Sequence, residues 1–192
     1  GLLPRHRRRT KERLPSQSGL PPTEPYDFSG GLHQVINDIA YKLVTEEQID
    51  EITTRIAGEI DRDYASSGKK LLLLCILKGS VVFMGDLMKK IQRPVEIDFM
   101  KVSSYGSGTS SSGRINILLD LHRGDLSDID IVVVEDIVDS GRTLSYLENY
   151  LRLKGANSVS CCTMLDKPSR RQVDYTPKYV GAEIPDVFAV GY

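Results

Sequence analysis

An apolar run that passes directly into acidic residues is the feature that most constrains how this chain can fold. Residues 131–134 read Ile-Val-Val-Val, which predicts a strand buried on both faces inside a parallel sheet. Glu135 and Asp136 follow where we expect the strand to end, and ligands of open α/β sheets bind at that edge. Leucines at helical spacing between residues 144 and 151 predict a helix next. Residues 139–143 are therefore a loop from a strand to a helix.

The loop itself, Asp139-Ser140-Gly141-Arg142-Thr143, has the composition of a phosphate site. Backbone N–H groups at a helix N-terminus attract anions, Gly141 allows close approach, and Ser140 and Thr143 offer hydroxyls. The nearby carboxylates would repel a phosphate unless they face sugar hydroxyls, a base N–H or a divalent cation that itself binds phosphates. A phosphorylated sugar with a further phosphate leaving group meets both conditions.

This pattern resembles a known family. Two acids, two apolar residues and Asp-Ser-Gly-Arg-Thr after an apolar strand are similar to the phosphoribosyl-pyrophosphate signature of the type I phosphoribosyltransferases, in its hypoxanthine-guanine (6-oxopurine) form. The resemblance covers about residues 31–192, where we predict the phosphoribosyltransferase domain. It implies an α/β fold with a central, mostly parallel sheet flanked by helices, and a small base-binding hood.

The resemblance also implies a reaction of purine salvage. A 5-phosphoribosyl group would pass from phosphoribosyl pyrophosphate to N9 of hypoxanthine or guanine, with xanthine as a further candidate, giving the nucleoside 5′-monophosphate and pyrophosphate. Mg²⁺ is the implied cofactor. Glu135 and Asp136 would hold the ribose hydroxyls and the metal, and Asp139 would be the catalytic base. Residues 139–143 would bind the 5′-phosphate.

A second strand-to-helix loop matches the family's pyrophosphate site. Lys78 and Gly79 follow an apolar strand predicted at residues 71–77, and a cation beside helix amides suits an anion. The resemblance implies that these two residues bind pyrophosphate and that the peptide between Leu77 and Lys78 is cis.

A long loop is predicted from residue 103 to residue 113, because this Ser- and Gly-rich stretch has almost nothing to bury. Ser104 and Tyr105 match the Ser-Tyr pair of the family's lid loop. The implied role is to close over the reacting centre and exclude water, which would otherwise compete at the sugar carbon.

Three residues near the C-terminus match the family's purine site. Lys167 stands at the end of a strand predicted at residues 158–165, where the 6-oxopurine branch places the lysine that donates to O6. Adenine carries an amino donor at that position, so Lys167 argues against an adenine enzyme. Phe188 matches the aromatic residue that stacks on the base, and Ala189 the residue whose backbone contacts the ring edge.

Two helices are predicted ahead of the acidic strand. Thr45-Glu46-Glu47-Gln48 fits a capping box, and isoleucines at helical spacing continue from it to residue 60. The helix after Ser80 should bury Val81, Met84, Leu87 and Ile91 on one face.

The net charge of −1 combines a basic N-terminus with an acidic remainder. Residues 1–14 hold six basic side chains and one acidic, which leaves 19 basic and 25 acidic side chains elsewhere. An acidic body is a poor nonspecific binder of nucleic acid. Residues 1–30 are predicted to be a disordered extension, with organelle targeting, a nucleic-acid arm or a plain solvated tail left open.

Cysteine usage indicates a reducing compartment. Cys75, Cys161 and Cys162 lie in apolar runs without metal-type spacing, so we expect buried free thiols. No apolar run approaches the ~20 residues that cross a bilayer, and a cytoplasmic protein is predicted. The resemblance implies a homodimer or homotetramer with small-molecule substrates and no membrane partner.

Three other classes of protein could use a strand-to-helix loop of this kind. A dinucleotide-binding Rossmann loop needs Gly-x-Gly-x-x-Gly, but residues 139–143 hold one glycine. A kinase-like nucleotide binder needs a Walker lysine after a glycine, and this loop has none. The family continues past its Gly-Tyr pair with an Asp for Mg²⁺ and an Arg for pyrophosphate, whereas this sequence stops at Tyr192. The expectation is an incomplete C-terminus or impaired activity. A phosphoribosyltransferase-fold regulator that binds RNA or nucleotide without catalysis is the remaining alternative.

Overall fold

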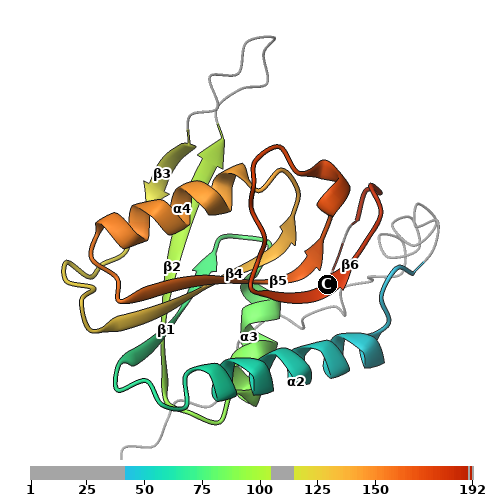
Figure 1. Ribbon diagram of the computed structural model, residues 1–192. Coiled ribbons are helices and arrows are strands. Elements are labelled where there is room, and N and C mark those ends of the chain that lie inside the picture. The colour runs from blue at the N-terminus through green and yellow to red at the C-terminus, as the bar shows by residue number, and fades with distance from the viewer. Residues whose placement is uncertain (1–41, 105–114, 190, 192) are drawn as a thin grey trace, which may run out of the picture. The chain divides into compact units, whose positions relative to one another are not determined.

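A six-stranded sheet forms the centre of the structure, a computed structural model that describes residues 42–104, 115–189 and 191 (Figure 1). Its strands, in chain order, are β1 (Lys70–Ile76), β2 (Val95–Ser104), β3 (Ile115–Leu119), β4 (Ile129–Val138), β5 (Ser158–Asp166) and β6 (Tyr179–Glu183). The spatial order is β3-β2-β1-β4-β5-β6, and all neighbours pair in parallel except β2 and β3. The prediction of a mostly parallel sheet is confirmed.

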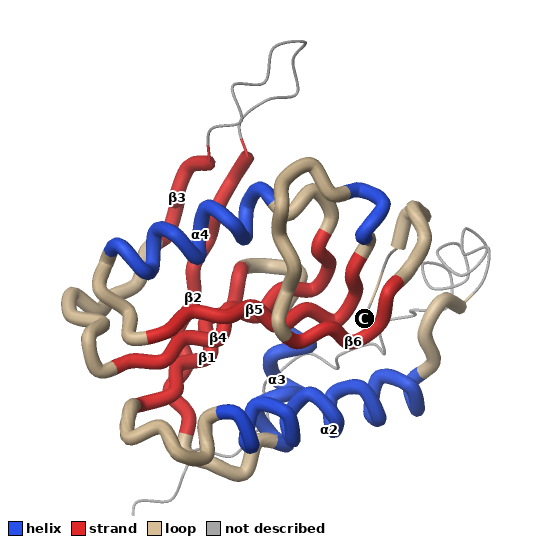
Figure 2. Tube along the Cα trace, viewed as in Figure 1, coloured by secondary structure: helices blue, strands red, loops and turns tan. Residues whose placement is uncertain are grey.

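Helices cover both faces of this sheet. The helices α2 (Glu46–Asp63) and α3 (Val81–Lys90) lie on one face, and α4 (Arg142–Leu153) lies on the other (Figure 2). Alternate residues of the strands divide between the two layers: Leu73 packs with α2 and α3, while Leu72 and Leu74 pack with α4. Within the part of the chain that the structure describes, no helix is both long and apolar enough to cross a membrane.

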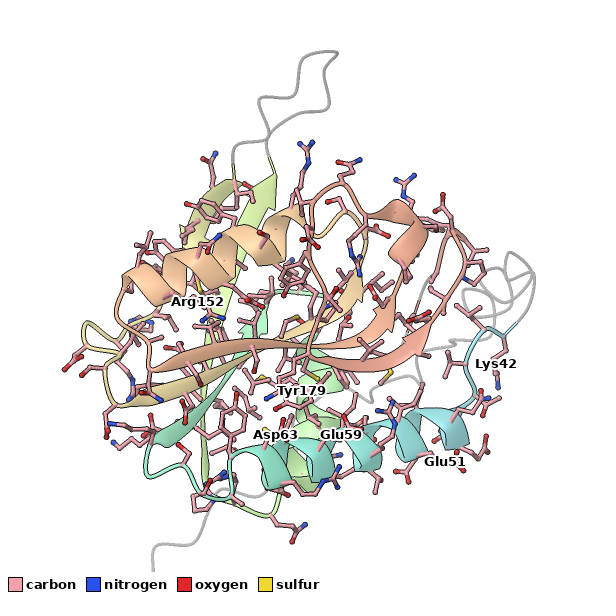
Figure 3. The ribbon with its side chains drawn as sticks, viewed as in Figure 1. Lys42, Glu51, Glu59, Asp63, Arg152 and Tyr179 are labelled. Atoms are coloured by element: carbon pink, nitrogen blue, oxygen red, sulfur yellow. The ribbon has the colours of Figure 1, made fainter. Side chains whose placement is uncertain are left out.

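The start of α2 follows its sequence signal. The Thr45 hydroxyl accepts a hydrogen bond from the Gln48 backbone N–H, and the Gln48 side chain accepts one from the Thr45 N–H, which confirms the capping box. Ile56 and Ile60 of the predicted stripe are fully buried. At the far end of the helix, the Tyr179 hydroxyl of β6 donates to Asp63 at 2.9 Å, so α2 and the last strand are tied together (Figure 3).

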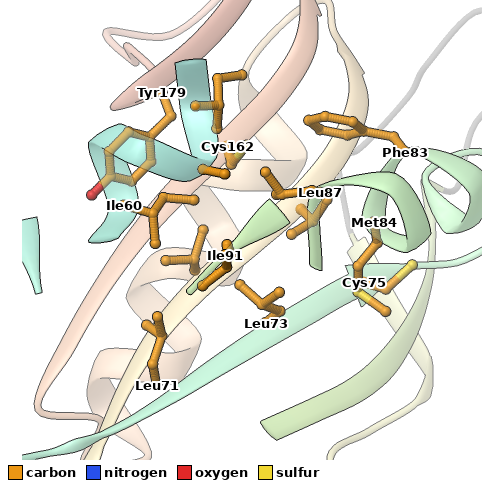
Figure 4. Close-up of a cluster of buried hydrophobic side chains, with 14 of the residues drawn as sticks. Ile60, Leu71, Leu73, Cys75, Phe83, Met84, Leu87, Ile91, Cys162 and Tyr179 are labelled. Carbon is orange, nitrogen blue, oxygen red and sulfur yellow. The ribbon is translucent and has the colours of Figure 1, made fainter. Parts of the chain in front are cut away.

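The buried face of α3 differs from its prediction. Phe83, Met84 and Leu87 point into the core beside Cys75 and Cys162 (Figure 4). Ile91, just past the helix, is buried as predicted. Val81 is instead 42% exposed, so its assignment to the apolar face was wrong and Phe83 takes that place. All three cysteines are buried and free, as predicted.

Two predicted boundaries also move. Ser103 and Ser104 continue β2, because residues 103–104 pair with Asn116 and Ile115 of β3, so the predicted loop begins too early. Tyr105 and the predicted extension at residues 1–30 lie outside the described residues.

The acidic pair is the second boundary correction. Glu135 and Asp136 lie inside β4 rather than after its end. β1 pairs with β4 up to Val134, whereas β5 stays paired with β4 to Val138. Hydrogen bonding to β5 therefore keeps the two acids in the strand after the β1 partner has turned away.

Candidate active site

Three loops leave the sheet at one edge. The strands β1, β4 and β5 are adjacent and parallel, so their carboxyl ends lie on the same side. Lys78 follows β1, Asp139 follows β4 and Lys167 follows β5. The sheet thus brings the three predicted binding segments together.

The loop between β4 and α4 has the conformation of an anion site. Gly141 caps α4 in the left-handed region with φ +75°, which favours glycine. The first intrahelical bond runs from Ser145 N–H to Gly141 O at 2.9 Å, so the amides of residues 142–144 have no acceptor within the helix. A pocket of about 210 Å³ opens over this loop. Its lining includes five of the predicted site residues, Glu135, Asp139, Ser140, Gly141 and Thr143. Arg142 is exposed at the helix start.

The Lys78–Gly79 loop lies directly against the acidic strand. The peptide between Leu77 and Lys78 is cis, as the resemblance implied. A Cβ built on Gly79 would stand 1.9 Å from Asp136 Oδ2 and 2.7 Å from its Cγ, so only glycine fits there without displacement. This contact joins the predicted pyrophosphate loop to the predicted metal-linked acid. Ser80, fully buried, anchors the loop by donating its hydroxyl to the Ile76 carbonyl.

The two adjacent carboxylates of β4 influence each other. Burial, together with the hydrogen bond and negative charge of Asp136, raises the pKa of Glu135 well above its ordinary value. A bound cation would favour the ionised form of Glu135. In residues 42–104 and 115–189, no group of three or more His, Cys, Asp or Glu side chains is arranged to hold a metal. Two carboxylates completed by substrate oxygens are nevertheless a usual setting for Mg²⁺.

The predicted base and the predicted O6 donor form an ion pair. Lys167 Nζ lies 3.3 Å from Asp139 Oδ1, and the Lys167 side chain is 9% exposed while that of Asp139 is 53% exposed. The backbone N–H of Lys167 also donates to Val138 O at 2.9 Å. The lysine is therefore held beside Asp139, which lines the pocket, and its charge is directed at the loop that follows β4.

The remaining predicted residues are spread around this centre. Phe188, in the segment after β6, is 95% exposed, and Ala189 beside it is half-buried. Ser104 ends β2. Neither Phe188 nor Ala189 lines the pocket in the described part of the chain, and the roles of all three residues remain predictions.

Two residues that support the anion loop were missed from the sequence. Arg171 donates to Asp139 O at 2.6 Å and forms an ion pair with the buried carboxylate of Asp166. In the sequence, the only signal for these two residues is that they are charged and lie close to Lys167. Charged residues at the surface of a protein give the same signal.

A larger hollow of about 610 Å³ lies elsewhere, between α2 and α3. Five of its lining side chains are acidic: Glu46, Glu47, Asp50, Glu51 and Asp86. It contains no predicted site residue, and its negative charge disfavours a phosphorylated substrate.

The geometry agrees with comparisons to known proteins. Residues 42–192 match the model of the phosphoribosyl transferase domain. Hypoxanthine-guanine phosphoribosyltransferase of Staphylococcus aureus strain Mu50 is 44% identical over 156 residues, which cover 81% of this chain and 86% of that protein. The bifunctional protein TilS/HprT of Listeria monocytogenes serotype 4b is 42% identical over 163 residues, covering 85% of this chain and 25% of that protein.

Solved structures give the same result. A crystal structure of a hypoxanthine phosphoribosyltransferase from Staphylococcus aureus has a TM-score of 0.74 at 42% identity, covering 80% of this chain and 82% of that chain. A hypoxanthine phosphoribosyl transferase structure from Trypanosoma cruzi has a TM-score of 0.75 at 36% identity, with the coverages 80% and 82%. This chain belongs to the phosphoribosyl transferase family. The predicted family and fold class are confirmed, and so is the prediction of an enzyme.

Proposed function

We propose that this protein transfers the 5-phosphoribosyl group of phosphoribosyl pyrophosphate to N9 of hypoxanthine or guanine, with xanthine as a further substrate to be tested. The observation that carries the proposal is the 3.3 Å ion pair of Lys167 and Asp139 beside the amide loop that begins α4. The ion pair can recognise the purine base, and the adjacent amide loop can bind the phosphate of phosphoribosyl pyrophosphate. The names of the relatives support the same reaction.

The 5′-phosphate would bind at the α4 N-terminus. The backbone amides of the loop, the Ser140 and Thr143 hydroxyls and the positive end of the helix all suit a dianion. Arg142, exposed at the first helical position, adds a positive charge there. The acidic residues of the same pocket would face the ribose hydroxyls. Their carboxylates can accept hydrogen bonds from those hydroxyls.

Pyrophosphate would leave toward the Lys78–Gly79 loop. The Lys78 ammonium and the Gly79 amide would stabilise its negative charge. Mg²⁺ fits the adjoining carboxylates, because Asp136 lies against Gly79 and Glu135 is its neighbour in β4. Burial and the nearby Asp136 together raise the pKa of Glu135, and a bound cation would favour its ionised form. When bound, Mg²⁺ would supply charge neutralisation for the leaving group.

The purine would be recognised and activated by the ion pair. Lysine has three N–H donors, so Lys167 can donate to purine O6 while it stays within reach of Asp139. Asp139 would accept the N7 proton as N9 attacks the anomeric carbon, with inversion through an oxocarbenium-like transition state. Such proton transfer typically contributes ~10²–10⁴-fold. Phe188 would stack on the base, Ala189 would contact its edge, and Ser104 and Tyr105 would close over the centre.

The test is pyrophosphate release in the presence of Mg²⁺ and phosphoribosyl pyrophosphate, with hypoxanthine, guanine, xanthine and adenine offered separately. We expect release with the oxopurines and none with adenine. Release with adenine alone would refute the role of Lys167. No release with any base, although the nucleoside 5′-monophosphate still binds, would favour the regulator that binds nucleotide without catalysis.

Two further expectations accompany the reaction. We expect a homodimer or homotetramer and a cytoplasmic location, as the family resemblance implies. Sedimentation at several protein concentrations would measure the first, and fractionation of the source cells the second.

A further inference from the structure

The segment that follows β5 lies behind the anion loop and holds its backbone. Arg171 Nη1 donates to the carbonyl of Asp139 at 2.6 Å and to that of Val138 at 3.3 Å. Its Nε donates to the Tyr175 carbonyl at 2.9 Å, and its Nη2 pairs with the Asp166 carboxylate. The Arg171 side chain is only 16% exposed, so these bonds are made largely away from water.

Hydrogen bonds from backbone N–H groups hold the same stretch of the loop. Lys167 N–H donates to Val138 O at 2.9 Å, and Gln172 N–H donates to Ser140 O at 3.0 Å. Three consecutive carbonyls, those of residues 138–140, therefore all accept hydrogen bonds from residues 167–172. In a planar trans peptide the C=O and the following N–H point in opposite directions. The N–H groups of residues 139–141 consequently point away from Arg171, toward the pocket side of the loop.

Close packing keeps the loop on this support. A Cβ built on Gly141 would lie 3.0 Å from Tyr175 Cβ and 3.1 Å from Arg171 Cδ. The loop thus packs closely against the Arg171 stem and the Tyr175 side chain, and a side chain at residue 141 would have to push one of them aside.

We propose that Arg171, held by Asp166, is a positioning residue that turns the amides of the anion loop toward the 5′-phosphate. The inference rests on the proposed function and adds a residue that fixes its phosphate site. Asp166 is buried and neutralises the guanidinium, so Arg171 acts by orienting carbonyls rather than by attracting the phosphate. A lysine could not replace it, because the planar guanidinium directs several donors at fixed angles and an ammonium does not.

The experiment compares Arg171→Gln and Arg171→Lys with Arg170→Gln. The neighbouring Arg170 is a matched control, since its ion pair with Asp186 spans 3.5 Å at the surface. Calorimetry would give dissociation constants for inosine 5′-monophosphate and for inosine, which lacks the phosphate. We expect both Arg171 variants to bind the monophosphate about 10- to 100-fold more weakly, as for loss of one hydrogen bond to a charged group, and inosine unchanged. Arg170→Gln should match the unaltered protein.

Steady-state kinetics gives a second readout. Because phosphate contacts are made in both ground and transition states, KM for phosphoribosyl pyrophosphate should rise with kcat within about twofold of the unaltered value. If Arg171→Gln does not fold, the same measurements on Arg171→Lys test the positioning role.

Each outcome bears on a different claim. The positioning role would be overturned if a folded Arg171 variant bound both ligands as the unaltered protein does, or bound both more weakly by the same factor. If the unaltered protein itself shows no preference for the monophosphate over inosine, the proposed function fails and this inference fails with it.

Discussion

The contact between Gly79 and Asp136 gives the sharpest test of how this site is assembled. In Gly79→Ala, the new methyl carbon would lie 1.9 Å from Asp136 Oδ2, whereas ordinary contact begins at 3.4 Å. About 1.5 Å must therefore be gained by moving the carboxylate or the loop. Either movement separates two groups that the proposed reaction needs together at the leaving pyrophosphate.

The expected loss follows from that displacement. A misplacement of about 1 Å in a reacting site can cost about 10²-fold in rate. We therefore expect kcat/KM for phosphoribosyl pyrophosphate to fall about 100-fold, equivalent to about 2.7 kcal/mol of transition-state stabilisation. The moving atoms belong to the end of a half-buried side chain, so the free energy of unfolding should fall by only about 1 kcal/mol.

Gly85→Ala provides the matched control. Gly85 lies inside α3, and a Cβ built there meets nothing within 4 Å. Alanine in a helix interior should raise the free energy of unfolding by about 0.5–1 kcal/mol and leave kcat/KM unchanged. Pyrophosphate-release kinetics and urea unfolding measure both variants. A folded Gly79→Ala protein with unaltered kcat/KM would refute the view that this contact sets the geometry of the leaving-group site.

Three further predictions concern single carboxylates and the buried lysine. Asp139→Asn, at a side chain 53% exposed, should keep the melting temperature but lower kcat by about 10²–10⁴-fold in the same assay. Lys167→Met should raise KM for hypoxanthine about 10- to 100-fold, because a hydrogen bond from a charged donor is lost, and steady-state kinetics would show it. Asp130→Asn should lower the free energy of unfolding by about 1–3 kcal/mol, measured in urea. Burial raises the pKa of Asp130, but hydrogen bonds from two serines and an asparagine outweigh it and hold the pKa below 3.8. Its contribution is thus present at neutral pH and lost as the pH falls below that value, so the two proteins should converge there.

The parts of this fold that the sequence predicts are those governed by local rules. Four β-branched or apolar residues in a row identify the centre of β4, and the Thr45–Gln48 pair identifies the start of α2. Gly141 is predicted only as a point of close approach in the anion loop, and its left-handed φ of +75° is a conformation that glycine adopts without strain. These features need no information from distant segments.

The errors occur where distant segments decide the outcome. Periodicity allows either Val81 or Phe83 on the buried face of α3, and packing against α2 and the sheet selects Phe83. The strand β4 continues through Glu135 because β5 remains beside it, which no local pattern of residues 131–138 contains. The approach of Gly79 to Asp136 likewise depends on how β1 and β4 end relative to each other.

Two adjacent arginines show why the supporting residues of the site escaped prediction. Arg170 and Arg171 have the same side chain and neighbouring positions, yet Arg170 lies at the surface opposite Asp186, whereas Arg171 is only 16% exposed and pairs with the buried Asp166. The short turn at Pro168–Arg170 determines which of them faces the sheet, and of the two arginines Arg171 donates to the carbonyls of Val138 and Asp139. The residue type alone does not reveal that a side chain orients the backbone. A guanidinium can donate hydrogen bonds to water, to a carboxylate or to a carbonyl. Such residues become identifiable only when the direction of each peptide they contact is known.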